Sequence, residues 1–343
     1  MRPTNLAVTL AALSLVAPLA KAAGQAAAYT VPTNLPGVQT FIAPAEGFNP
    51  LTASDEELAM FGFPPRPDAE AAPEAYESWR RAMLSSRERV IPQLEITNIS
   101  HHRNLHTSEK TEAGTDSSLN WSGVVDLGGA STYNNSTSFR SIFAAWVVPV
   151  ARQAYGACTG GTDYLFSWVG IDGYNSNDVL QAGSESDATC NILQHESSYY
   201  AWFEWWPNSA TRLTNLPVSA GNDMFVEIWN TTAKEGFAYI ANLTTNQYVT
   251  LGLVPPPGTS LIGDTAEWVV ERPEENGILA TLTNYVSDYF SACYASTFGG
   301  KVYTPGATSA IQVTMLDNSF KPISVPYLLG PTAIWFEDEG SAR

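Results

Sequence analysis

The chain has 343 residues and a formal net charge of −17, with 17 Lys or Arg against 34 Asp or Glu. This length favours a leader followed by one sizeable domain. From residue 116 onward, 22 acidic residues face 8 basic ones. That balance argues against nucleic acid or an anionic membrane surface as a partner, because both are bound through clustered Lys and Arg.

The N-terminus predicts a secretory signal peptide over residues 1–22. Arg2 precedes an apolar run from Leu6 to Leu19, and Ala20-Lys21-Ala22 fits the small-residue pattern of a cleavage site. A membrane anchor is the alternative, but the apolar run is short for a membrane span. We therefore expect a secreted, extracellular protein with no membrane partner.

Residues 23–115 are predicted to form a propeptide. Their first part, to about residue 65, shows little periodicity, whereas apolar residues recur at helical spacing between Pro73 and Val90. From Trp79 to Lys110 the charge turns basic. The three histidines of this basic segment are His101, His102 and His106. We expect it to dock electrostatically on the acidic domain and to loosen in acid, where carboxylates lose charge and histidines gain it. An ordinary solvated linker is the alternative.

Residues 116–343 are predicted to form an all-β domain, a sandwich or a barrel. Short runs rich in β-branched and aromatic residues alternate with clusters of Gly, Asn, Asp, Ser and Pro, and helical periodicity is nearly absent. Hairpin turns are indicated at AGND (220–223) and KEG (234–236). A third, at 245–247, is weaker because no Gly follows its Asn.

The three cysteines are Cys158, Cys190 and Cys293. A secreted protein can form disulfides, and a bond between Cys158 and Cys190 would close a loop around Gln181. An odd count leaves one cysteine over, and the sequence leaves the pairing open. No C-x-x-C occurs, which disfavours a zinc or redox site.

The commonest hydrolase motifs are absent from the sequence. There is no G-x-S-x-G, H-E-x-x-H, D-T-G or D-S-G, and no Gly-rich phosphate loop. His195 is the single histidine after residue 115, which limits Ser-His and Cys-His schemes. What remains is carboxylate and amide chemistry, with no metal or other cofactor expected.

Two segments carry polar side chains where apolar ones are expected. In TAEWVVERP, read as a strand, Glu267 and Glu271 share one face. In SWVGIDGYNSNDVLQAG, Gln181 is expected near the end of a buried strand. Between these segments, AWFEWWP places Glu204 among indoles, where desolvation would raise the pKa of its carboxyl. A buried amide and a buried carboxyl facing one cleft would supply an oxyanion donor and a general base.

Each of these residues also has a purely structural interpretation. Trp121 and Trp168 fit a sandwich core, because aromatic residues dominate such interiors. Asp172 precedes Gly173 and is typical of a turn. Glu204 could be a hydrogen-bonded core carboxyl, and Gln181 could cap backbone groups at a strand end.

Four segments in order, WVGIDG, LQAG, AWFEWWP and AEWVVE, preceded by NWSGVV, together resemble the glutamic peptidases, or eqolisins. The resemblance covers roughly residues 120–290. It implies a sandwich of two antiparallel sheets with a substrate cleft on its concave face. It also implies that the catalytic Glu is Glu271, not Glu267. The catalytic Gln would be Gln181, since Gln194 lacks the downstream Gly.

The resemblance further implies a mechanism for an acid endopeptidase. Glu271 would take a proton from water, Gln181 would donate a hydrogen bond to the oxyanion, and Glu271 would protonate the leaving amine. It also places five supporting residues near the cleft: Trp121, Trp168, Asp172, Tyr199 and Glu204. Asp172 and Glu204 are expected as orienting carboxyls. The expected partners are polypeptide substrates and the protein's own propeptide, acting as inhibitor of a monomeric enzyme.

Two other functions stay open at this point. Ten tryptophans and several carboxyls would also suit a carbohydrate-active sandwich, either a glycoside hydrolase or a lectin-like module. A non-catalytic binding domain is a third possibility.

The sequence departs from the family pattern after the candidate Glu. Arg272 and Pro273 follow Glu271, so the strand should end there or lie at an edge. Arg272 could also lower the pKa of a nearby carboxyl.

Overall fold

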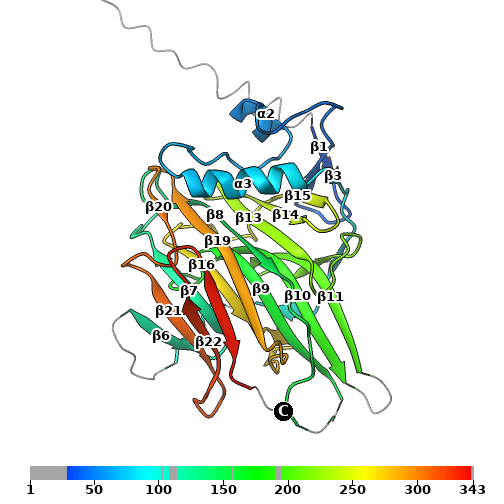
Figure 1. Cartoon of the computed structure of the whole chain (residues 1–343), viewed down its shortest axis with the longest axis vertical. Coiled ribbons are helices and arrows are strands. Elements are labelled where there is room, and N and C mark those ends of the chain that lie inside the picture. The colour runs from blue at the N-terminus through cyan, green and yellow to red at the C-terminus, as the bar shows by residue number, and fades with distance from the viewer. Residues whose placement is uncertain are drawn as a thin grey trace, which may run out of the picture.

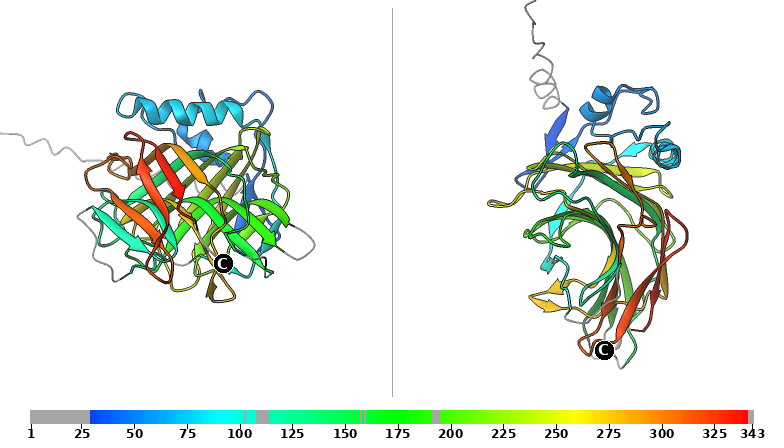
Figure 2. Two further views of the ribbon diagram at one scale, coloured as in Figure 1. Left: turned by 60° about the horizontal axis from the view of Figure 1, so that its bottom comes forward. Right: turned by 90° about the vertical axis from the view of Figure 1, so that its left-hand side faces the viewer.

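The computed structural model describes residues 29–101, 103–107, 114–156, 158, 160–190 and 195–340. The signal peptide predicted over residues 1–22 lies outside these ranges, as do His102 and Gln194. The described residues form a sandwich of two large antiparallel sheets, with two helices confined to the N-terminal part (Figures 1 and 2). The prediction of an all-β domain is therefore confirmed.

The first sheet carries the candidate site. Its strands lie in the order β12, β11, β10, β9, β16, β7 and β21, with antiparallel neighbours. Their bounds are β7 Trp121–Leu127, β9 Thr162–Ile171, β10 Val179–Cys190, β11 His195–Trp206, β12 Thr211–Leu213, β16 Thr265–Glu271 and β21 Ile311–Leu316. The short β6 (Thr115–Ser118) runs parallel to β21.

The second sheet packs behind the first. Its strands lie in the order β15, β14, β13, β8, β19 and β23. Their bounds are β8 Phe139–Val147, β13 Asp223–Thr232, β14 Glu235–Asn242, β15 Gln247–Leu253, β19 Ser287–Thr297 and β23 Ile334–Asp338. β20 (Val302–Tyr303) pairs with β19, and β22 (Pro322–Leu328) pairs with both β21 and β23. β22 therefore joins the two sheets along one edge.

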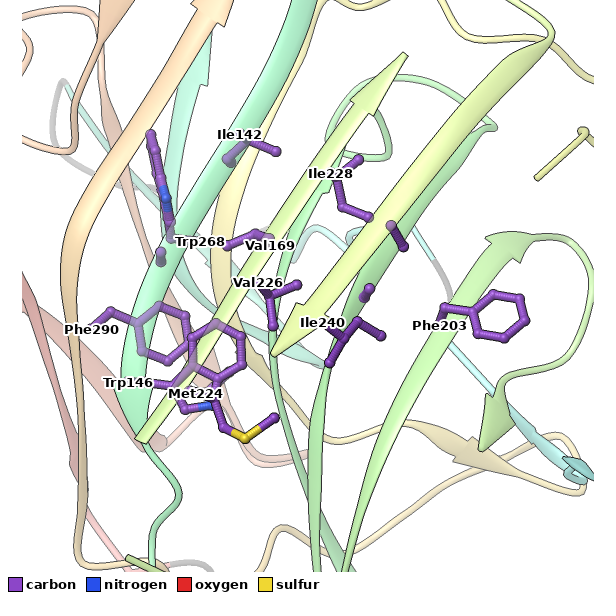
Figure 3. Close-up of a cluster of buried hydrophobic side chains, with 14 of the residues drawn as sticks. Ile142, Trp146, Val169, Phe203, Met224, Val226, Ile228, Ile240, Trp268 and Phe290 are labelled. Atoms are coloured by element: carbon purple, nitrogen blue, oxygen red, sulfur yellow. The ribbon is translucent and has the colours of Figure 1, made fainter. Parts of the chain in front are cut away.

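Alternation of side chains along each strand creates the core between the sheets. On β16, Trp268 and Val270 point into this core, while Glu267, Val269 and Glu271 point to the opposite face. Figure 3 shows Trp268 and Val169 of the first sheet close to Ile142 and Val226 of the second. The Trp268 indole finds a partner in this layer, since it donates to the Phe143 carbonyl oxygen at 3.0 Å.

The residues before 91 form what we call the lobe (residues 29–90), which packs on the outer face of the second sheet. It contains β1 (Thr30–Pro32), β2 (Val38–Phe41), α2 (Asp55–Met60), α3 (Pro73–Ser85) and β3 (Glu88–Arg89). α3 begins with Pro73, whose fixed φ suits the first turn, and it buries Trp79 and Met83 on one side. Figure 1 shows α3 lying across the strands of the second sheet.

The following stretch, which we call the arm (residues 91–107), crosses the outer face of the first sheet. β4 (Leu94–Ile96) pairs with β12, and β5 (Ile99–Ser100) pairs with β17 (Glu274–Glu275) of the β17–β18 hairpin, whose second strand is Ile278–Leu279. The arm therefore adds a short strand to the structure on each side of that face.

Three further features bear on the sequence predictions. Cys158 and Cys190 form a disulfide that closes a loop around Gln181, and Cys293 is a buried free thiol. The 234–236 and 245–247 turns connect paired strands, but the 220–223 turn does not, because β13 pairs with β8 and β14 rather than with β12. Within the described part of the chain, no helix has the length and apolar character needed to cross a membrane.

Candidate functional site

The candidate site lies on the outer face of the first sheet, turned away from the core. Register places Gln181 of β10 opposite Glu204 of β11, and Gly183 opposite both Trp202 of β11 and Trp168 of β9. Trp168 in turn pairs with Val269 of β16, two residues before Glu271. The side chains of Gln181 and Glu271 therefore share one face, diagonally across Trp168.

Glu271 ends β16, and three side chains contact its carboxyl oxygens. The Trp168 indole donates to Oε2 at 2.9 Å, and the Asn120 amide donates to Oε1 at 3.1 Å. Nδ1 of His101 lies 3.1 Å from Oε2. Glu271 is fully buried, and these contacts take the place of the water molecules that would hydrate an exposed carboxyl group. They fix the orientation of both oxygens.

Two glycines explain how Trp168 can lie flat between the candidate residues. A Cβ at Gly183 would overlap the Ser167 carbonyl oxygen and the backbone of Trp168. A Cβ at Gly170 would come within 2.8 Å of the Trp168 ring and 3.3 Å of Cβ of Gln181. The Gly of LQAG is therefore required by close packing of β10 on β9. This gives the motif a physical reason and distinguishes Gln181 from a Gln without that glycine.

Gln181 lies near the beginning of β10, which corrects the prediction that it lies near the end of a strand. The strand before the Asp172-Gly173 turn is β9, and Gln181 is the third residue of the next strand. Its side chain is fully buried, yet neither the amide nitrogen nor the amide oxygen has a hydrogen-bond partner among the described residues. Buried polar groups without partners are rare and unfavourable in proteins.

Glu204 is also fully buried on this face. Burial raises the pKa of its carboxyl well above the ordinary value, and the nearby charge of Glu271 adds to the shift. Its Oε2 accepts a hydrogen bond from the backbone N–H of His101 at 3.2 Å. Burial likewise raises the pKa of Glu267, which lies on the same face four residues before Glu271.

The remaining predicted residues divide into two groups. Trp121 pairs with Glu271 in register, and its ring stands edge-on to Trp168 at 5.0 Å between centroids. Asp172 does not contact the candidate pair; its carboxylate accepts from the backbone N–H groups of residues 262–264 and anchors that loop. Tyr199 lies on the core side of β11, where its hydroxyl accepts from the Ala151 N–H. The structure therefore does not bring Asp172 or Tyr199 to the site.

The arm fills this face of the sheet. The His101 imidazole stacks on Trp202 at 4.2 Å between centroids and meets Phe166 edge-on at 4.1 Å. Beyond it, the Leu105 N–H donates to Oδ1 of Asn120 at 2.8 Å. His101 is fully buried, and it lies against the carboxylate that the sequence singled out. Neither Asn120 nor the contact of His101 with Glu271 was predicted.

The arm is not held mainly by charge, in contrast to the electrostatic docking expected from the sequence. In the described ranges, its ion pairs to residues after 113 are His101 with Glu271 and His106 with Asp116. Arg103 instead donates to the Asn177 side chain, and Arg80 pairs with Glu77 inside α3. Strand pairing and aromatic stacking therefore provide most of the contacts.

The departure after Glu271 has a defined structural result. β16 ends at Glu271, as Pro273 predicted, and the chain then forms the β17–β18 hairpin. Arg272 turns away from Glu271 and donates to the carbonyl oxygens of Leu119 and Leu316. Burial lowers the pKa of Arg272 to about 10. Arg272 therefore connects the ends of neighbouring strands. No contact between Arg272 and Glu271 supports the prediction that Arg272 lowers the pKa of a nearby carboxyl.

No group of three or more His, Cys, Asp or Glu side chains in the described ranges is arranged to hold a metal ion. The chemistry at hand is one carboxylate with fixed orientation, one buried amide without a partner, and a second carboxyl that favours its protonated form.

Comparisons with known proteins place the chain in a family. The model of the Peptidase A4 family matches residues 120–321. Aspergillopepsin-2 of Aspergillus niger is 30% identical over 200 residues, covering 56% of this chain and 69% of that protein. Scytalidopepsin B of Scytalidium lignicola is 29% identical over 157 residues, covering 46% of this chain and 52% of that protein.

The fold agrees as well. The crystal structure of scytalido-glutamic peptidase with a transition state analog inhibitor superposes with a TM-score of 0.52 at 22% identity, covering 64% of this chain and 98% of that one. The family model spans more than half of the chain and includes Gln181, Glu204 and Glu271. The chain belongs to the Peptidase A4 family and is a glutamic-type endopeptidase.

Proposed function

We propose that the domain after residue 115 hydrolyses peptide bonds in acid with Glu271 as general base and acid and Gln181 as oxyanion stabiliser. Glu271 removes a proton from water, whose oxygen forms a bond to the scissile carbonyl carbon. The Gln181 amide N–H donates to the resulting oxyanion. The C–N bond then breaks, and the proton held by Glu271 passes to the leaving amine.

The unpartnered amide of Gln181 carries this proposal. It is buried on the same face as a carboxylate whose oxygens are oriented by Trp168 and Asn120. An amide with no partner in the resting protein is a donor preorganised for a group that arrives with the substrate. Glu204, with its raised pKa, stays protonated to higher pH and limits the negative charge beside Glu271.

In this proposal residues 23–115 act as the propeptide, and the arm is its inhibitory part. The imidazole of His101 takes the place beside Glu271 that the attacking water needs. The arm also runs between the edge of β12 and the β17–β18 hairpin, as an extended substrate would. Polypeptide substrates would therefore bind where the arm now lies, after the arm has been displaced and cut.

The protein is proposed to be secreted and to act as a monomer. The signal-peptide pattern of residues 1–22 supports secretion, and a disulfide between Cys158 and Cys190 suits an oxidising compartment.

The test is hydrolysis of denatured casein between pH 2 and pH 7 by the acid-treated precursor, with three variants. Glu271→Gln and Gln181→Ala should each lower kcat by about a hundredfold or more, because each removes a group that acts in the transition state. Glu267→Gln is the matched control, a buried carboxyl on the same strand and face, and should retain most activity. Pepstatin and chelators should have no effect.

Activity that survives Glu271→Gln would move the catalytic carboxyl elsewhere and end this proposal. The carbohydrate-active alternative gives a different pattern, in which changes at Glu204 or Glu267 remove activity while Gln181 is dispensable. The family match does not favour that alternative.

A further inference from the structure

The lobe and the arm are attached to the domain in different ways, although both lie in the propeptide predicted from the sequence. The lobe covers the outer face of the second sheet, opposite the site, and lies before the region matched by the family model, which begins at residue 120. The arm covers the site itself. Removal of the arm is all that opening the site requires.

The lobe shares an apolar cluster with the second sheet. From the lobe come Leu58, Phe63, Ala75, Trp79 and Met83, and from the sheet come Phe143, Phe225, Trp229, Tyr239, Tyr248 and Tyr294. Trp79 is 0% exposed. Without the lobe, this row of aromatic side chains would face water as a continuous apolar patch, which folded monomers rarely expose.

Backbone pairing completes the lobe's attachment. β2 pairs antiparallel with Leu251–Leu253 of β15, and β3 pairs parallel with the start of the same strand. The lobe thus covers the free edge of β15, and edges left open invite pairing with other chains. Between the two contacts, the Arg89 guanidinium lies 5.1 Å from the Phe63 ring and 4.9 Å from the Tyr248 ring.

The arm is attached through fewer apolar side chains, although its His101 is buried against Trp202 and Phe166. β4 and β5 contribute three and two paired residues, and Leu94 and Ile99 are its buried large aliphatic side chains among the described residues. Ile91, at the junction of lobe and arm, is 51% exposed, and Ile96 is 60% exposed. The junction is therefore accessible, whereas the lobe on one side of it is built into the fold.

The lobe covers carboxyls that would make its attachment stronger in acid. Burial raises the pKa of the Glu227 carboxyl, which faces the lobe between Phe225 and Trp229. The groups facing it are the Arg140 guanidinium, which opposes the shift, and the Tyr239 phenol on β14. At the border, burial also raises the pKa of Asp223, opposed by Arg81 of α3. A carboxyl that binds its proton more tightly in the docked state favours docking as the pH falls.

We propose that the lobe remains bound to the second sheet after the arm has left, as a non-covalent second chain of the active enzyme. This rests on the proposed function only in taking the arm as the inhibitory part. The partner of the aromatic face is then a segment of the same gene product, held by apolar packing and strand pairing. The active enzyme is expected to be a complex of two chains cut from one precursor molecule, so it still contains a single copy of the gene product.

The experiment separates lobe and arm without relying on the protein's own activity. A recognition sequence for a sequence-specific protease is inserted after Val90, the precursor is cut there at neutral pH, and the products are run on size-exclusion chromatography at pH 7 and pH 3. Mass spectrometry of each peak identifies the chains. We expect the lobe to co-elute with the remainder at both pH values, and to be present in the active fraction of acid-treated wild-type enzyme.

Two variants on α3 make the test specific. Trp79→Ala removes the buried centre of the cluster and should raise the dissociation constant of the lobe by about a hundredfold or more. Leu84→Ala, at a position 43% exposed on the same helix, should leave co-elution unchanged. Elution of the wild-type lobe apart from the remainder at pH 3, or active wild-type enzyme without the lobe, would overturn the inference. A co-eluting but inactive acid-treated enzyme would count against the proposed function alone.

Discussion

Asn120 holds one oxygen of Glu271 and is itself held in place. Its Oδ1 accepts from the Ser118 hydroxyl at 2.8 Å, which aims the amide N–H at the carboxylate. We therefore assign Asn120 as a positioning residue. In the processed enzyme, Asn120→Ala should lower kcat by about tenfold to a hundredfold with little change in KM, because Glu271 loses its orientation.

A pH profile distinguishes positioning from a general loss of folding. Asn120→Asp sets a second carboxyl against Glu271, so the acid limb of the profile should move to higher pH. Asn230→Ala is the control, because Asn230 is a buried amide that binds the Phe139 carbonyl far from the site. It should reduce stability while kcat of the folded enzyme and the pH profile stay unchanged. An Asn120→Asp profile identical to wild type would exclude the assigned role.

Sequence reasoning reached the buried carboxyl and amide because alternation and motif order both point to them. It missed Asn120, although NWSGVV was noted. Asn120 precedes β7, and side-chain alternation predicts direction only within a strand. Tyr199 shows the opposite limit. Alternation along β11 puts Tyr199 on the face opposite to Glu204, whereas the family resemblance placed both residues near the cleft.

Among the elements, the arm is the one whose role can be tested by a single side chain. His101→Ala leaves β4 and β5 paired but removes the ring that stacks on Trp202 and contacts Glu271. We expect the uncut His101→Ala precursor to hydrolyse a short peptide at pH 5 at least tenfold faster than the uncut wild type. The measurement is the initial rate of peptide hydrolysis, with gel analysis to show that the precursor is intact.

His106→Ala is the matched control for this prediction. His106 is a second histidine of the arm, but it pairs with Asp116 at the border and is partly exposed. It should leave the precursor as inactive as wild type. Equal rates for both variants would show that the His101 side chain does not block the site.

Elements with strong local signals were predicted, and elements made by tertiary contacts were not. The helical spacing after Pro73 gave α3, and Pro273 gave the end of β16. The stretch before residue 65 showed little periodicity, yet it forms β1, β2 and α2. β2 exists because β15 offers a free edge, and such pairing leaves no pattern in a strand of four residues. The turn at 245–247 forms with Asn246 at φ 60°, a conformation that Asn tolerates in place of Gly.

Across the whole molecule, buried carboxyls set the direction in which stability depends on pH. Burial raises the pKa of Asp126 and of Asp288 to about 7 from an ordinary value of 3.8. A carboxyl with a raised folded-state pKa contributes its full stability below the unfolded value and loses it as the pH rises toward the folded value. The free energy of unfolding should therefore fall between about pH 4 and pH 7, by at most about 4 kcal/mol for each group.

This predicts a protein that is most stable where its proposed activity lies. In a Glu271→Gln background, which prevents self-digestion under the proposed mechanism, Tm measured by calorimetry should be highest near pH 4 and fall toward pH 7. Asp126→Asn and Asp288→Asn should each flatten that fall, because an amide cannot lose a proton. Glu196→Gln, at an exposed position, should leave the slope unchanged. A Tm that is constant or rises from pH 4 to pH 7 would show that these carboxyls do not govern stability, and the acid preference would then have to come from the chemistry at Glu271 alone.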